Sequence, residues 1–123
     1  MKLIIAGGRD FEDRILATTA FGNFEQEVLE LTGVEKPFTE IVSGGARGAD
    51  RVGEFIGRFY NISIKQFIPD WEGLGKRAGF ARNAEMCDYA DALLAFWDGK
   101  SRGTKQMIDY TTKKGLIVKV INY

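Results

Sequence analysis

Short apolar runs alternate with longer amphipathic stretches along the whole chain, and this alternation is the feature that most limits the fold. The apolar runs predict five strands, at 2–6, 40–43, 63–68, 92–96 and 116–121. The stretches between them predict helices at about 11–31, around 52–59, at about 76–89 and at 103–114, with a loop at 70–75. Strand–helix alternation of this kind gives right-handed crossovers and a parallel sheet covered on both faces.

The residues within the strands predict their order in the sheet. The first, second and fourth strands are almost entirely apolar, as central parallel strands are. The third and fifth contain Lys65 and Lys119, and lysine is common on edge strands. We therefore expect an α/β fold, a Rossmann-like three-layer sandwich with a parallel five-stranded sheet of order 3-2-1-4-5. At 123 residues, one domain spanning 1–123 is expected.

Composition narrows the classes of function. Seventeen basic residues balance seventeen acidic ones, which argues against binding nucleic acid mainly by charge. The chain has no histidine and one cysteine, Cys87, so a zinc site is close to excluded and no metal site is assigned. A lone cysteine also favours a reducing compartment. The apolar segment at 2–6 is too short for a signal peptide and no run approaches membrane-spanning length, so we expect a cytoplasmic protein with no membrane partner.

Three glycine-rich segments follow the first, second and fourth strands. They are Gly7–Asp10, Ser43–Asp50 and Asp98–Thr104. In the predicted sheet all three lie at the carboxyl edge, around the switch point between the first and fourth strands, where α/β sheets bind ligands. Glycine lets the backbone approach a ligand, and the following helix offers free N–H groups, which is a phosphate-binding design. The alternative is that these glycines only form tight turns.

The standard nucleotide fingerprints are absent. The chain has neither G-x-G-x-x-G after the first strand nor G-x-x-x-x-G-K-[ST], which argues against a common NAD enzyme and a P-loop NTPase.

Several side chains in these segments have two interpretations. Ser101 either caps a helix only, or also presents the N–H groups of Gly103 and Thr104 to a ligand. Asp50 either complements a helix dipole or accepts a hydrogen bond from a ribose hydroxyl.

Three larger side chains also have two interpretations each. Arg9 and Arg82 pair either with phosphate or with surface carboxylates. Trp71, in a polar segment, either covers the core or stacks on a base.

The chain resembles the YspA/YpsA-related branch of the SLOG superfamily over nearly its whole length. The matching segments, in order, are 7–11, 42–50, 70–71, 75–79, 82–86, 90–92 and 96–104. The resemblance implies a Rossmann-like fold of a kind that occurs in small bacterial and phage proteins. It also implies sensing or processing of nucleotide-derived ligands, including ADP-ribose derivatives. By resemblance, the pocket is lined by Gly8, Arg9, Ser43, Gly44, Asp50, Ser101, Gly103 and Thr104.

Two relatives in that superfamily imply rival functions. Ser43–Asp50 is similar to a stretch of the DNA-processing protein of bacterial DNA uptake, which binds single-stranded DNA, but the neutral charge here argues against that role. The motif Pro-Gly-Gly-x-Gly-Thr-x-x-Glu of the LOG phosphoribohydrolases aligns with the region ending at Gly103-Thr104. Its glutamate position is Met107 here, so the resemblance does not carry the hydrolysis over.

Together these observations predict a domain that binds or senses a nucleotide or nucleotide-derived phosphate ligand. The alternatives are a hydrolase of a nucleotide N-glycosidic or phosphate bond, with Asp10, Asp50 and Asp98 as candidate carboxylates, and a single-stranded nucleic-acid binder. No cofactor is required, although Mg²⁺ accompanying a phosphate ligand is compatible with these residues. A homo-oligomer is compatible with this sequence. The candidate ligand-binding residues are Gly7, Gly8, Arg9, Asp10, Ser43, Gly44, Gly45, Arg47, Gly48, Asp50, Trp71, Arg82, Asn83, Asp98, Gly99, Ser101, Gly103 and Thr104.

Overall fold

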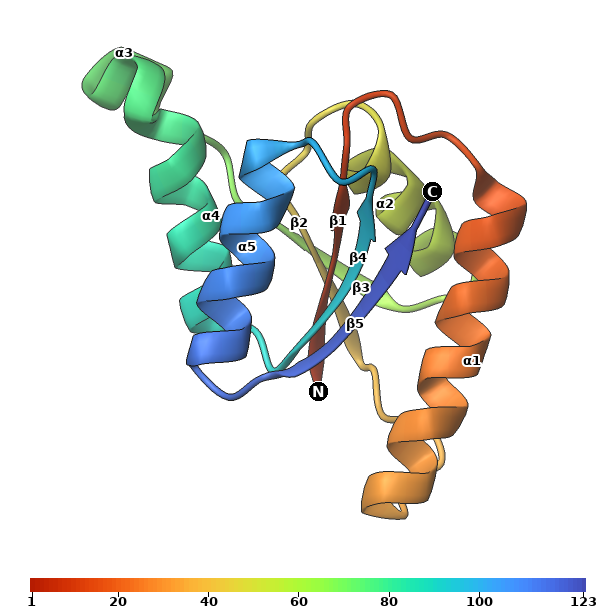
Figure 1. Ribbon diagram of the computed structural model, residues 1–123. Coiled ribbons are helices and arrows are strands. Elements are labelled where there is room, and N and C mark those ends of the chain that lie inside the picture. The colour runs from red at the N-terminus through yellow and green to blue at the C-terminus, as the bar shows by residue number, and fades with distance from the viewer.

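Five strands form one parallel sheet in the computed structural model, which describes residues 1–123. The strands are β1 Lys2–Gly7, β2 Glu40–Ser43, β3 Ser63–Gln66, β4 Ala92–Trp97 and β5 Ile117–Asn122. They lie in the order β3-β2-β1-β4-β5, and every neighbouring pair is parallel (Figure 1). The predicted α/β fold and strand order are therefore confirmed, with Lys65 and Lys119 on the two edge strands.

The helices complete a three-layer arrangement. They are α1 Arg14–Thr32, α2 Ala49–Phe59, α3 Trp71–Leu74, the 3-10 turn η1 Gly75–Arg77, α4 Ala78–Tyr89 and α5 Arg102–Lys113. Helices α1 and α2 cover one face of the sheet, and α4 and α5 cover the other (Figure 1). No helix combines the length and the apolar character needed to cross a membrane.

Strand β1 shows why the central strands are apolar on both sides. Leu3 and Ile5 pack into the cluster beneath α1 and α2, whereas Ile4 and Ala6 pack into the cluster beneath α4 and α5. Successive side chains of a strand point to opposite faces, so a strand covered on both faces needs an unbroken apolar run. Burying each of the larger side chains stabilises the fold by about 1.5–3 kcal/mol.

Two helices begin at positions other than those predicted, because a side chain caps each helix there. Helix α1 begins at Arg14 rather than near residue 11, because the Asp13 carboxylate accepts a hydrogen bond from the Leu16 N–H at 2.9 Å and starts the helix there. The predicted loop at 70–75 instead contains α3, where the Asp70 carboxylate accepts from the Gly73 N–H at 2.9 Å. The predicted strand at 63–68 ends earlier, at Gln66.

Two large apolar residues that continue the helical spacing of their segments are exposed. Leu31 is 74% exposed and Phe59 is 67% exposed. Both lie in the last turn of their helix, where the helical spacing continues beyond the edge of the sheet that it packs against.

Candidate functional site

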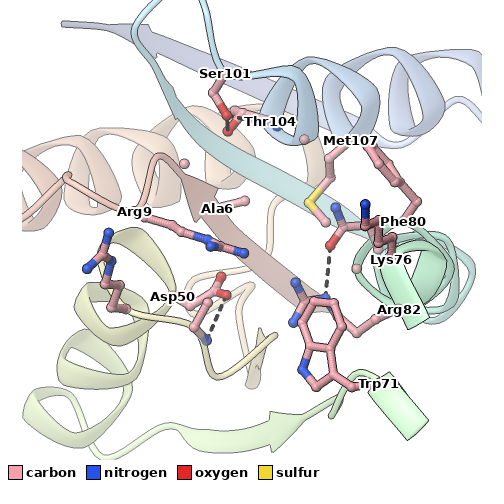
Figure 2. Close-up of a pocket in the computed structure, with 16 residues that line it drawn as sticks. Ala6, Arg9, Asp50, Trp71, Lys76, Phe80, Arg82, Ser101, Thr104 and Met107 are labelled. Carbon is pink, nitrogen blue, oxygen red and sulfur yellow. Dashed lines mark hydrogen bonds between the residues drawn. The ribbon is translucent and has the colours of Figure 1, made fainter. Parts of the chain in front are cut away.

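A cavity of about 350 Å³ opens at the carboxyl edge of the sheet (Figure 2). It lies between the loops that follow β1, β2 and β4 and the α3–α4 segment, at the switch point where β1 pairs with β4. Its volume is in the range of small-molecule sites. Ten of the predicted residues line it: Gly7, Arg9, Arg47, Asp50, Trp71, Arg82, Asn83, Ser101, Gly103 and Thr104.

The other predicted residues lie outside the lining. They are Gly8, Asp10, Ser43, Gly44, Gly45, Gly48, Asp98 and Gly99. Several of them instead hold the loops in position through hydrogen bonds or close backbone contacts.

Sequence reasoning missed six lining residues, namely Ala6, Ala46, Lys76, Gly79, Phe80 and Met107. Lys76, Phe80 and Asn83 recur at spacings of four and three residues, which places them on one side of the helical segment. That spacing was the available signal for extending the site along α4.

Gly48 joins two of the loops by close backbone contact. Its φ is +80°, and a Cβ atom there would lie 2.4 Å from the Gly8 carbonyl oxygen and 2.5 Å from the Arg9 carbonyl carbon. The N–H of Ala49 also donates to the Gly8 carbonyl at 3.2 Å. Gly48 therefore lets the β2–α2 loop seat against the β1–α1 loop, and its role is to position Arg9 and Asp50.

Hydrogen bonds among polar groups outside the cavity lining stabilise the β2–α2 loop. The Ser43 hydroxyl donates to the Glu54 carboxylate at 2.6 Å and accepts from the Gly45 N–H at 3.0 Å. On the cavity side, Arg82 donates to the Gly44 carbonyl at 2.7 Å. This contact links the loop to α4 across the cavity.

The loop after β4 presents the start of α5 to the cavity. The Asp98 carboxylate accepts from the N–H groups of Lys100 and Ser101, each at 2.8 Å, and fixes the turn. The Ser101 side chain caps α5 at Thr104, and their hydroxyl oxygens are 2.9 Å apart. The first N–H groups of a helix have no intrahelical acceptor. Those of α5 begin at Arg102, beside the cavity.

Cationic side chains dominate the cavity. Arg9, Arg47, Lys76 and Arg82 line it, against one carboxylate, Asp50. The four ion pairs of the chain are Glu54–Arg58, Lys105–Asp109, Asp88–Lys114 and Glu27–Lys119, and none contains a cavity cation. The chain has zero net charge, yet four cationic side chains that take part in none of its ion pairs line this one cavity.

Burial disfavours the charges of Asp50 and Arg82. Burial raises the pKa of Asp50, partly opposed by the hydrogen bond from the Ala46 N–H at 3.1 Å and by the charge of Arg82. Burial lowers the pKa of Arg82, and the charge of Asp50 opposes that shift. Each side chain is desolvated here, so an incoming ligand meets groups that are already stripped of much of their water.

Replacing Asp50 with asparagine is expected to change the pH dependence of stability. The folded state holds the Asp50 proton more tightly than the unfolded chain, so this carboxyl lowers the free energy of unfolding as the pH rises from 3.8 through its raised pKa. Asp50→Asn removes that loss while keeping an oxygen that accepts from Ala46. Urea unfolding of both proteins between about pH 4 and pH 7 measures the difference, which should grow in favour of the variant. Parallel pH profiles would contradict the assignment.

No group of three or more histidine, cysteine, aspartate or glutamate side chains is arranged to hold a metal ion. The three candidate carboxylates do not lie together. Asp50 lines the cavity, Asp98 accepts hydrogen bonds from backbone N–H groups of its own loop, and Asp10 is exposed outside the lining.

Comparison with known proteins gives one informative relative. No family model matches the chain, and no solved structure matches it significantly. The gene 61 protein of Mycobacterium phage D29 is 33% identical over an alignment of 129 positions, gaps included, which covers 99% of this chain and 95% of the phage protein. Similarity of this extent along both chains shows common ancestry, and the chain belongs to the same family as the phage D29 gene 61 protein.

Proposed function

We propose that the cavity binds a nucleotide or nucleotide-derived ligand through its phosphate groups. The observation that carries this proposal is the set of four cavity cations, none within ion-pair distance of a carboxylate, in the same cavity as the first N–H groups of α5. A helix N-terminus favours anions through its dipole and its unsatisfied N–H groups. Arginine adds planar donors that match phosphate geometry.

In the proposed arrangement, the phosphate and the ribose of the ligand contact different residues of the cavity. The phosphate lies at the start of α5, where Gly103 leaves space and Thr104 adds a hydroxyl. Arg9 lines the cavity from the β1–α1 loop and Arg82 lines it from α4 (Figure 2). Asp50 accepts a hydrogen bond from a ribose hydroxyl, as acidic residues do in other dinucleotide folds. Any Mg²⁺ arrives with the phosphate, because Asp50 is the one carboxylate of the lining.

We also assign the family to the SLOG superfamily and place the protein in the cytoplasm. The matching glycine-rich segments and the parallel sheet of order β3-β2-β1-β4-β5 support the first assignment. The free, buried thiol of Cys87 is compatible with the second.

Nucleotides are expected to raise the melting temperature of the protein. A ligand that binds only the folded state stabilises it by about 2.7 kcal/mol at a concentration of one hundred times Kd. The measurement is a thermal shift with nucleoside mono- and diphosphates, nucleotide sugars and inorganic phosphate at millimolar concentration. No shift across this panel would overturn the proposal.

The protein is expected to release no base from nucleoside monophosphates. Met107 lines the cavity where the LOG motif has its glutamate, and a thioether neither activates water nor stabilises an oxocarbenium-like centre. Asp109 is exposed outside the cavity and pairs with Lys105 at 3.0 Å. Chromatography of nucleotides incubated with the purified protein measures base release, and release above the buffer control would instead support the hydrolase alternative.

A further inference from the structure

The two ends of the cavity differ in chemistry. Ser101 and Thr104 lie at one end, at the start of α5, and Trp71 lies at the other, on α3 (Figure 2). Phe80 lines the cavity from α4, on the same segment as Trp71. One end is therefore polar and rich in N–H groups, whereas the other is aromatic.

The rings of Trp71 and Phe80 have no aromatic or cationic partner within the protein. Trp71 is 53% exposed and Phe80 is 50% exposed. The eight aromatic ring contacts and four cation–ring contacts of the chain include neither of them. Helix α3 has no buried residue, so Trp71 does not serve to anchor it in the core.

Arg82 also lines the cavity, on the same helix as Phe80, and hydrogen bonds hold it in place. It donates through Nη1 to the Gly44 carbonyl at 2.7 Å and through Nε to the Asn83 side chain at 2.9 Å. A fixed guanidinium in a cavity that also contains a helix N-terminus and aromatic rings suits a ligand that combines a phosphate with a flat ring.

We propose that Trp71 and Phe80 form a stacking rim for a nucleobase, and that this rim makes the site prefer a base-bearing phosphate over a base-free sugar phosphate. The inference rests on the proposed function, because it takes the phosphate end as given and assigns the opposite end. Stacking on aromatic side chains tolerates every base, so the rim selects for the presence of a base more than for its identity.

The test compares the four common nucleoside 5′-monophosphates with ribose 5-phosphate by calorimetric titration. Loss of one stacking ring typically weakens binding by about fivefold to 150-fold per base. At least one monophosphate should therefore bind about tenfold or more tightly than ribose 5-phosphate. Trp71→Ala should remove most of that advantage and leave the ribose 5-phosphate affinity within about twofold, whereas Trp71→Phe should restore part of it.

Phe59→Ala is the matched control. It removes an exposed ring, 67% accessible, that lies on α2 outside the cavity, and it should leave both affinities unchanged. Equal affinities for the monophosphates and ribose 5-phosphate would overturn the rim while leaving the phosphate site intact. An advantage that survives in Trp71→Ala and Phe80→Ala combined would do the same. Failure of every probe to bind would overturn the proposed function itself.

Discussion

Gly103→Asp is expected to abolish nucleotide binding while the chain stays folded. Gly103 is the second residue of α5 and lines the cavity, so a carboxylate there occupies the position proposed for the phosphate. Juxtaposed like charges cost several kcal/mol, which predicts a loss of about a hundredfold or more in affinity. The fold should tolerate the change, because the nearest atom to a Cβ at this position is 3.9 Å away. An acidic residue in the first turn also favours the helix dipole.

Gly103→Asn separates charge from bulk in that experiment. Asparagine has nearly the same shape as aspartate without the charge, so it should weaken binding far less. The measurements are calorimetric titration with the tightest-binding nucleotide of the thermal-shift panel and urea unfolding of each variant. Equal losses in the two variants would indicate crowding rather than charge. Unchanged binding in Gly103→Asp would show that the phosphate lies elsewhere.

Gly48→Ala is expected to destabilise the protein by about 3–5 kcal/mol, because it combines backbone strain with a steric overlap. At φ +80° and ψ −130°, Gly48 has a conformation that side-chain-bearing residues rarely adopt. The added methyl group would also lie 2.4 Å from the Gly8 carbonyl oxygen, and backbone on both sides has little room to move. The β1–α1 and β2–α2 loops must then separate, which displaces Arg9.

Gly75→Ala is the control for this prediction. Gly75 has φ +58° and ψ −130°, so it shares the backbone cost, but no atom lies within 4 Å of its Cβ position. Urea unfolding should therefore show a loss of only about 1–3 kcal/mol for Gly75→Ala. Similar losses for the two variants would mean that close contact between the loops contributes nothing to stability.

The sheet could be predicted from the sequence because its determinants are local. An unbroken apolar run marks a strand buried on both faces, and a lysine within the run marks an edge, so residue types alone separated the central strands from the edge strands and fit the observed order. Helix α3 was missed because four residues, Trp71–Leu74, are too few for a periodic pattern. Its boundary residues, the N-cap Asp70 and the C-cap Gly75, are of types that also occur in loops.

The roles of individual glycines in the site could not be predicted in the same way. Gly48 and Gly103 both stand in glycine-rich loops after strands, and both were assigned to ligand binding. In the structure a Cβ atom at Gly48 would overlap backbone of another loop, whereas one at Gly103, which lines the cavity, would meet only the Asn83 side chain at 3.9 Å. Only the neighbours in space distinguish them, and those neighbours come from distant parts of the chain.

The α3–α4 segment is attached to the fold through α4, where Ala78, Met86 and Cys87 are buried, while α3 itself buries nothing. The end of the cavity proposed for the phosphate is formed by loops that pack against the sheet and against one another. Substitutions in α3 can therefore accumulate with little cost to folding. Within the family of the gene 61 protein, the proposed stacking rim at Trp71 can therefore change with little effect on folding, whereas the loops around Gly48 and Ser101 are constrained by their own packing.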